Sequence, residues 1–273
     1  MLKSAIYGLA VGDALGVPYE FNQRNTYVCN DMVGYGTWQQ PKGTWSDDTS
    51  LTLATCESIK AKNKIDLKDI FNNFRLWFLE DKFTAHGELF DIGNVTREAI
   101  LKGSGVDDIN SNGNGSLMRI LPLAFIECTD EDVENVSALT HAHEISKEAC
   151  VIYVNIAKEL IKGRNIKDIL KEAKCSDIYA RVPYIYDLSK NDIKSTGYVV
   201  DTLEASLWCV ATTTSYKECV LKAVNLGGDT DTISAIAGGL AGIIYGYDNI
   251  PKEWIDNLAN KELIEKCLFK TSK

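Results

Sequence analysis

Several features are scarce in this chain of 273 residues. It has only five prolines, and 45% of its residues are hydrophobic, so disorder, collagen-like repeats and low-complexity tracts are excluded. The longest apolar run, 235–245, is far shorter than the roughly 20 residues that span a membrane. No internal repeat of the length used by solenoids or propellers is found.

Cysteine spacing and net charge indicate the cellular compartment of the protein and the partners it is expected not to bind. The eight cysteines lie far apart without a Cys-x-x-Cys pair, and there are only three histidines, which predicts small buried thiols rather than disulfides or zinc. Acids outnumber bases by 38 to 29, and no basic stretch is long enough to follow a phosphate backbone. We expect a cytoplasmic protein that binds neither nucleic-acid backbone nor membrane.

Helical periodicity dominates the chain, and sustained strand-like alternation is scarce. Apolar residues recur with the 3.6-residue period along 145–161, and Gly163 follows where a C-terminal cap belongs. The same reasoning predicts helices at 49–62, 67–80, 95–102, 131–139, 199–212, 216–226 and 232–245. The intervening loops at 22–44, 103–115 and 190–197 are too short to be linkers. The sequence therefore predicts an all-α fold and one compact domain over residues 1–273.

Two acidic segments stand immediately before predicted helices: Gly43–Thr49, with Asp47 and Asp48, and Gly227–Thr232, with Asp229 and Asp231. Ordinary N-capping is one interpretation, because Ser, Thr and Asp are preferred there and acids complement the helix dipole. A cap needs a single acceptor, however, and confined neighbouring carboxylates repel. A bound cation explains two such pairs better.

Carboxylate and hydroxyl oxygens select hard divalent ions, Mg²⁺, Mn²⁺ or Ca²⁺, over zinc. Four carboxylates exceed what one Mg²⁺ usually takes from a protein, so two ions sharing a bridging Asp are plausible. The helix at 232–245 is rich in Gly and Ala, which lowers its intrinsic propensity but permits close backbone contact in the middle of a bundle.

Other polar segments suit a binding site less specifically. The turn Gly113–Gly115 enters an apolar predicted helix, and its backbone N–H groups suit a phosphate, although Gly-Asn-Gly is also a generic turn. From spacing alone Glu20 is a surface carboxylate, and Asp91 could cap the helix at 95–102. His141 and its neighbour two residues on do not share a helix face, so this pair is not expected to bind zinc.

As an ordered set, these motifs resemble those of the ADP-ribosylglycohydrolases of the dinitrogenase-reductase-activating glycohydrolase type. The match extends from about residue 4 to residue 246 and rests on Gly12–Gly16 with Glu20, Ser46–Thr49, Asp91–Gly93, Gly113–Ser116 with Met118–Arg119, Thr140–His141 and Gly228–Thr232. The resemblance implies an all-α orthogonal bundle with two Mg²⁺ or Mn²⁺ ions that removes ADP-ribose from a modified target.

Individual roles follow from the resemblance, position by position. It implies metal ligation by Ser46, Asp47, Asp48, Asp229, Asp231 and Thr232, where Ser46 keeps the hydroxyl that many relatives supply with Thr. It implies further catalytic roles for Asp48 and Asp229, and makes either Glu20 or Asp91 the general base or an acid steering the water. It implies ADP-ribose contacts by Gly113, Asn114, Gly115, Ser116, Met118, His141 and Tyr198; for the segment of Tyr198 (197–204), a plain helix start is the alternative.

The implied reaction breaks a glycosidic bond through an oxocarbenium-like transition state. Arginine-linked targets are preferred by analogy with the bacterial members. Serine, a nucleic-acid base or O-acetyl-ADP-ribose would offer the same ADP-ribose group. An ADP-ribose-binding module without turnover and a metal-dependent phosphohydrolase are the alternatives from other classes. The hypothesis of a metal-dependent site requires that carboxylates from the first and last fifths of the chain lie close together in the folded protein.

Overall fold

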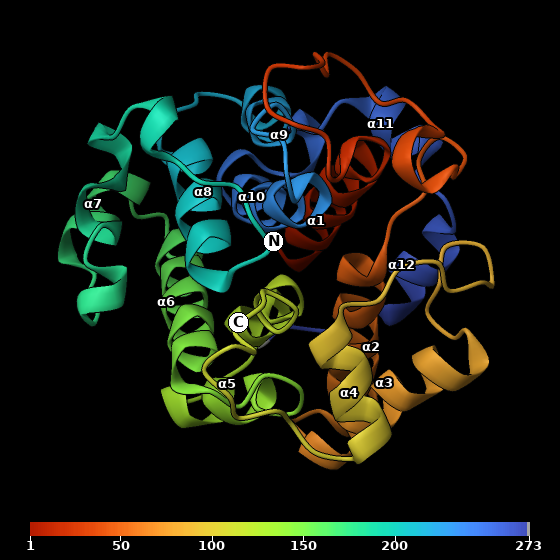
Figure 1. Cartoon of the computed structure of the whole chain (residues 1–273). Helices are drawn as coiled ribbons and strands as arrows, with labels where there is room; N and C mark the ends of the chain where they lie inside the picture. The colour runs from red at the N-terminus through yellow and green to blue at the C-terminus, as the bar shows by residue number, and fades with distance from the viewer. Residues whose placement is uncertain (272–273) are drawn as a thin grey trace.

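The computed structural model describes residues 1–271 (Figure 1). Its helices, in chain order, are α1 (Leu2–Gly16), α2 (Asp47–Lys62), α3 (Leu67–Glu80), α4 (Asn94–Lys102), α5 (Asp130–Ser137), α6 (Glu144–Ile161), α7 (Ile166–Glu172), α8 (Val199–Ala211), α9 (Tyr216–Val224), α10 (Thr230–Tyr245), α11 (Lys252–Asn257) and α12 (Lys261–Cys267).

The predicted all-α class is confirmed. Within residues 1–271 no strand forms, and pairing is limited to isolated bridges such as those joining Val106 to His141 and Gly113 to Tyr198. In this same range, none of the helices combines the length and apolarity needed to cross a bilayer. The eight cysteines are free thiols, and six of them are buried, as their spacing predicts.

Helices α1 and α10 form the centre of the bundle, although they come from opposite ends of the chain. They lie side by side in Figure 1, in red and blue. Their contact is made through backbone: a Cβ on Gly12 would lie 2.1 Å from the carbonyl oxygen of Ser234, and one on Gly8 would lie 2.3 Å from that of Gly238. The Ser234 hydroxyl also donates to the Gly12 carbonyl at 2.6 Å. Small residues thus let the two helices approach until their acidic segments meet.

The other helices surround this pair. In Figure 1, α2, α3 and α4 lie on one side of it and α6, α7 and α8 on the other. The predicted helix boundaries agree with the structure to within about two residues. One expectation is wrong: the glycine turn does not lead into an apolar α-helix but into two 3-10 segments, η3 (Leu117–Arg119) and η4 (Leu121–Phe125). Pro122 explains this, because it lacks an N–H donor and disfavours α-helical geometry in the residue before it.

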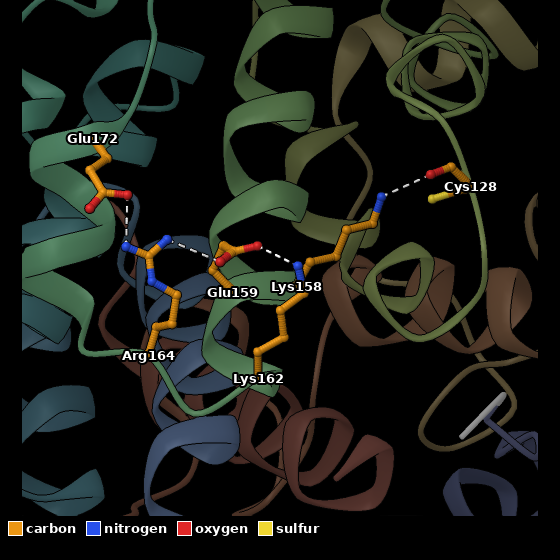
Figure 2. Close-up of polar contacts among 6 residues, drawn as sticks. All are labelled: Cys128, Lys158, Glu159, Lys162, Arg164 and Glu172. Atoms are coloured by element: carbon orange, nitrogen blue, oxygen red, sulfur yellow. Dashed lines mark hydrogen bonds and ion pairs between the residues drawn. The ribbon is translucent and has the colours of Figure 1, made fainter.

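An exposed network of ion pairs joins α6 to α7 (Figure 2). Arg164 bridges the two helices, pairing with Glu159 at 3.1 Å and with Glu172 at 2.7 Å. Lys162 pairs with Glu159 at 2.6 Å, and Lys158 donates to the Cys128 carbonyl at 3.0 Å. Because these groups remain in contact with water, the pairs orient α7 but contribute little stability.

Candidate active site

The two acidic segments meet at the centre of the molecule. Oxygen atoms of Asp13, Asp48 and Asp231 all lie within 4.8 Å of one another, and those of Glu20, Asp229 and Asp231 satisfy the same limit. Asp231 belongs to both groups and therefore joins α1, α2 and α10 at one point. Glu20 is 7% exposed, so it belongs to this cluster and is not the surface carboxylate that spacing alone favours.

Asp13 is the member of this cluster to which the sequence assigned no role. Its carboxylate accepts from the Ser46 and Thr49 backbone N–H groups, at 2.9 and 3.1 Å, and from the Thr49 hydroxyl at 2.6 Å. A residue of α1 therefore holds the N-terminus of α2. A single carboxylate inside the otherwise apolar run of α1 is the signal that could have identified it.

The capping interpretation fails for the four motif carboxylates. Ser46 caps α2, whereas Asp47 and Asp48 lie inside its first turn; Asp229 occupies the cap position of α10 without making a side-chain cap bond, and Asp231 lies in the first turn. The Oδ1 atoms of Asp48, Asp229 and Asp231 are buried without a hydrogen-bond partner among the described residues. A buried carboxylate oxygen needs a partner, and an oxygen-seeking cation is the partner that suits several at once.

Burial and mutual repulsion raise the pKa values of several carboxyl groups at this site. Desolvation is the main cause throughout. The pKa of Asp47, of Asp48 and of Asp231 lies well above its usual value, with neighbouring carboxylates adding to the effect. Burial and then the charge of Asp91 raise the pKa of Glu20 to about 8, and burial followed by Asp229 raises that of Asp91 to about 7. A positive charge among these groups would restore their ionised forms.

A pocket of about 420 Å³ opens over these acids. Residues from six separate motifs converge there, because its lining includes Glu20, Asp47, Asp91, Gly113, Asn114, Gly115, Met118, His141, Asp229 and Thr232. A larger pocket, of about 650 Å³, lies among the ends of α6, α8 and α10, but it has no carboxylate in its lining. The acidic pocket is therefore the candidate site, despite its smaller volume.

The glycine turn is fixed to the acids by Asn114. Its side-chain amide donates to Asp229 at 2.7 Å and to the Thr202 hydroxyl at 2.9 Å, and its backbone N–H donates to the Gly197 carbonyl at 3.1 Å. Two of the predicted ADP-ribose contacts lie outside the pocket lining. The Ser116 hydroxyl is fully buried and accepts from Ser137 at 2.9 Å. Tyr198 is 38% exposed at the cap position of α8.

The fold and this pocket define an all-α protein with a buried carboxylate cluster contributed by both ends of the chain. A family model described as ADP-ribosylglycohydrolase matches residues 2–271. The chain therefore belongs to the ADP-ribosylglycohydrolase family, and it is an enzyme of the glycohydrolase class.

Similar proteins agree with this assignment. The chain is 35% identical to ADP-ribosylarginine hydrolase Tri1 of Serratia proteamaculans, over 96% of this chain and 76% of the relative. It is 33% identical to the ADP-ribosyl-dinitrogen reductase glycohydrolase of Rhodospirillum rubrum, over 94% of this chain and 90% of the relative. A solved structure, titled ADP-ribosylglycohydrolase-related protein complex, superimposes with a TM-score of 0.84 at 30% identity, covering 97% of this chain and 94% of the other.

Proposed function

We propose that this chain hydrolyses the bond between ADP-ribose and an arginine side chain of a target protein, using two Mg²⁺ or Mn²⁺ ions. The observation that carries the proposal is the set of buried, unpartnered carboxylate oxygens beneath the pocket. The names of two similar proteins, an ADP-ribosylarginine hydrolase and a dinitrogen reductase glycohydrolase, support an ADP-ribosylated protein as the substrate class.

The donor set suits hard cations. Ser46, Asp47, Asp48, Asp229, Asp231 and Thr232 offer only oxygen atoms, which Mg²⁺ and Mn²⁺ prefer. Asp13 lies within the cluster, but hydrogen bonds from α2 already occupy both of its oxygens, so we assign it to the frame and not to the ligands. Ions bound there would orient the vicinal ribose hydroxyls and lower the pKa of a bound water.

Glu20 and Asp91 are the groups proposed to move protons. Both line the pocket, and without bound ions burial raises the pKa of Glu20 to about 8 and that of Asp91 to about 7. Bound cations would lower both values and leave the carboxylates ionised, which is the form a general base requires. One would take a proton from the attacking water. The variants Glu20→Gln and Asp91→Asn test which of the two is the base. Replacing the base should lower kcat by about 100-fold or more with little change in ADP-ribose affinity.

Aromatic side chains beside Glu20 favour a cationic target. Phe21 lines the pocket and is 67% exposed, its ring lies 6.2 Å from that of Trp38, and Phe90 lies 5.7 Å beyond. The Trp38 indole N–H donates to the Glu20 carboxylate. An arginine guanidinium stacks on aromatic faces and pairs with carboxylates, whereas a serine target offers neither interaction.

The test incubates the protein with arginine-linked and with serine-linked ADP-ribosyl peptides, each with Mg²⁺ or with chelator, and identifies the products by mass. Release of free ADP-ribose from the arginine peptide, dependent on the metal, is the expected result. Phe21→Ala should raise KM for this peptide while leaving inhibition by free ADP-ribose unchanged. Turnover of only the serine peptide would refute the arginine linkage.

Two other outcomes would replace the proposal as a whole. Tight binding of ADP-ribose without release from either peptide would identify a binding module. Formation of AMP or phosphate in place of ADP-ribose would identify a phosphohydrolase.

A further inference from the structure

Arg119, in η3, is a fully buried cation with no carboxylate partner within residues 1–271. Its Nη2 donates to the Thr140 hydroxyl at 2.8 Å and to the Val136 carbonyl at 3.2 Å, and its guanidinium lies 4.4 Å from the centre of the Phe74 ring. In the same range, its Nε and Nη1 atoms have no acceptor. Burying an unpaired guanidinium is costly, so an arginine kept there calls for a reason other than stability.

The contacts of Arg119 and Thr140 favour one direction for a hydrogen-bond chain. A guanidinium can only donate, so the Thr140 oxygen must accept from it. That oxygen can also accept from an Nδ1–H, but Thr140 is fully buried and its hydroxyl proton has no acceptor among the described residues other than Nδ1 of His141, 2.9 Å away. Donation from the hydroxyl to Nδ1 is therefore the arrangement that leaves no buried donor of Thr140 unpaired. An Nδ1 atom that accepts a hydrogen bond carries no proton, and a neutral imidazole must then carry its single proton on Nε2.

The Nε2 atom of His141 faces the glycine turn of the pocket. A Cβ on Gly115 would lie 2.8 Å from Cε1 and 3.3 Å from Nε2 of His141, so only glycine fits at position 115. A Cβ on Gly113 would lie 3.6 Å from Nε2, which is an ordinary contact distance. Nε2 has no hydrogen-bond partner among the described residues, although His141 lines the pocket. The nearby Thr96 hydroxyl also lines the pocket and is buried without a partner. The Nε2 atom of His141 and the Thr96 hydroxyl, both without hydrogen-bond partners among the described residues, therefore face the same part of the pocket.

We propose that Arg119 and Thr140 are positioning residues that hold His141 as the neutral Nε2–H tautomer, so that it donates a hydrogen bond to the pyrophosphate of ADP-ribose beside the Gly113–Gly115 turn. The ligand in this statement rests on the proposed function; the tautomer rests on the hydrogen-bond chain alone. Beside the turn the site then offers the ring N–H, the Thr96 hydroxyl and the backbone N–H of Gly115 as donors, whereas the Asn114 N–H is already bonded to the Gly197 carbonyl. Such a set suits an anion that must be kept apart from the neighbouring carboxylates.

The charge of Arg119 has a second effect on the ring. Burial first, and then repulsion from Arg119, lower the pKa of His141 to about 3. The ring therefore stays neutral at physiological pH, even though the pocket is acidic. A neutral ring does not pair with Asp229 or Asp91 and remains available to the ligand.

The test reads the tautomer directly. The chain has only three histidines, so the intact protein with ¹⁵N-labelled imidazoles gives three ring patterns in long-range ¹H–¹⁵N spectra. His86→Gln and His143→Gln variants assign them by subtraction. The expected result is a His141 ring protonated on Nε2 alone. A proton on Nδ1 in the wild-type protein would overturn the proposal.

Thr140→Val carries the functional arm, because valine has nearly the shape of threonine and avoids removing the buried Arg119 itself. Loss of the donor to Nδ1 should give a mixture of both tautomers and weaken ADP-ribose binding, measured by calorimetry, by about tenfold. Thr140→Ser keeps the hydroxyl and should behave as the wild-type protein. An unchanged ring spectrum or unchanged affinity in Thr140→Val would refute the positioning role.

The two levels of the argument can fail separately. An Nδ1–H ring in a protein that releases ADP-ribose refutes the positioning and leaves the proposed function standing. An Nε2–H ring in a protein that neither binds nor releases ADP-ribose refutes the proposed function, and with it the ligand of this hydrogen bond.

Discussion

Replacing Asp231 by asparagine is expected to stabilise the metal-free protein and to remove its response to Mg²⁺. Asp231 is 1% exposed, and its carboxylate has an oxygen within 4.8 Å of oxygens of Asp13 and Asp48 and an oxygen within 4.8 Å of oxygens of Glu20 and Asp229. Two unit charges 4.8 Å apart repel by about 3.5 kcal/mol at an effective dielectric constant of about 20. Protonation in the folded state relieves part of this repulsion, but it costs about 1.4 kcal/mol for each pH unit by which the pH exceeds the ordinary pKa of the carboxyl group.

Asparagine has the shape of aspartate without its charge, so we expect the variant to gain about 2–3 kcal/mol of unfolding free energy in chelator. For a chain of this size that corresponds to a rise in Tm of roughly 4–12 °C. The wild-type protein should instead gain about 2.7 kcal/mol when Mg²⁺ is raised to about 100 times its Kd, because the ion binds only the folded state. Release of ADP-ribose by the variant should be abolished.

The assay is thermal unfolding with chelator and across a Mg²⁺ titration, beside the peptide release assay. Asp187→Asn, at an exposed position, is the matched control and should leave both the metal response and turnover unchanged. A variant that melts as the wild-type protein does in chelator, and that still gains stability from Mg²⁺, would refute the assignment of Asp231 to a cation site.

Three further predictions concern stability. Burial raises the pKa of Asp91 to about 7, so between about pH 4 and pH 7 the folded form holds a proton that the unfolded chain, with an ordinary pKa of 3.8, has lost. The unfolding free energy in chelator should therefore fall as the pH rises through this range, and a flat profile in denaturant titrations would contradict the prediction. Gly12→Ala should lower the unfolding free energy, measured in urea, by about 3 kcal/mol or more, because its Cβ would lie 2.1 Å from the Ser234 carbonyl oxygen. The control Gly93→Ala, whose Cβ would lie 3.9 Å from the nearest neighbouring atom, should lower it by less than about 1 kcal/mol. Arg164→Ala, in the network of Figure 2, should change the unfolding free energy by less than about 1 kcal/mol and leave turnover unchanged. A larger loss of stability would contradict the expectation that these exposed pairs contribute little.

Local patterns identified most helices and the two acidic segments, whereas Glu20, Asp91 and His141 were assigned to the site only through the resemblance to the family. The helix at 67–80 agrees with α3 at both ends, because its apolar stripe and its polar flanks are properties of neighbouring residues. The acidic segments were recognisable because paired carboxylates at a helix start exceed what capping needs. The pattern did not show that Asp47, Asp48 and Asp231 lie inside the first turns of α2 and α10 while Asp229 occupies the cap position, because these places depend on which backbone groups are hydrogen-bonded.

The sequence by itself determined an all-α chain with two carboxylate pairs, since periodicity and residue type act over a few positions along the chain. Only the tertiary structure decided that Asp13 holds the start of α2, that Asn114 turns its amide toward Asp229, and that Arg119 is buried without a counter-ion. The physical reason is that these partners are set by the close packing of α1 on α10 and of the glycine turn on α8. Contacts between residues more than 100 positions apart, such as Asn114 with Asp229, leave no period in the sequence from which they could be read.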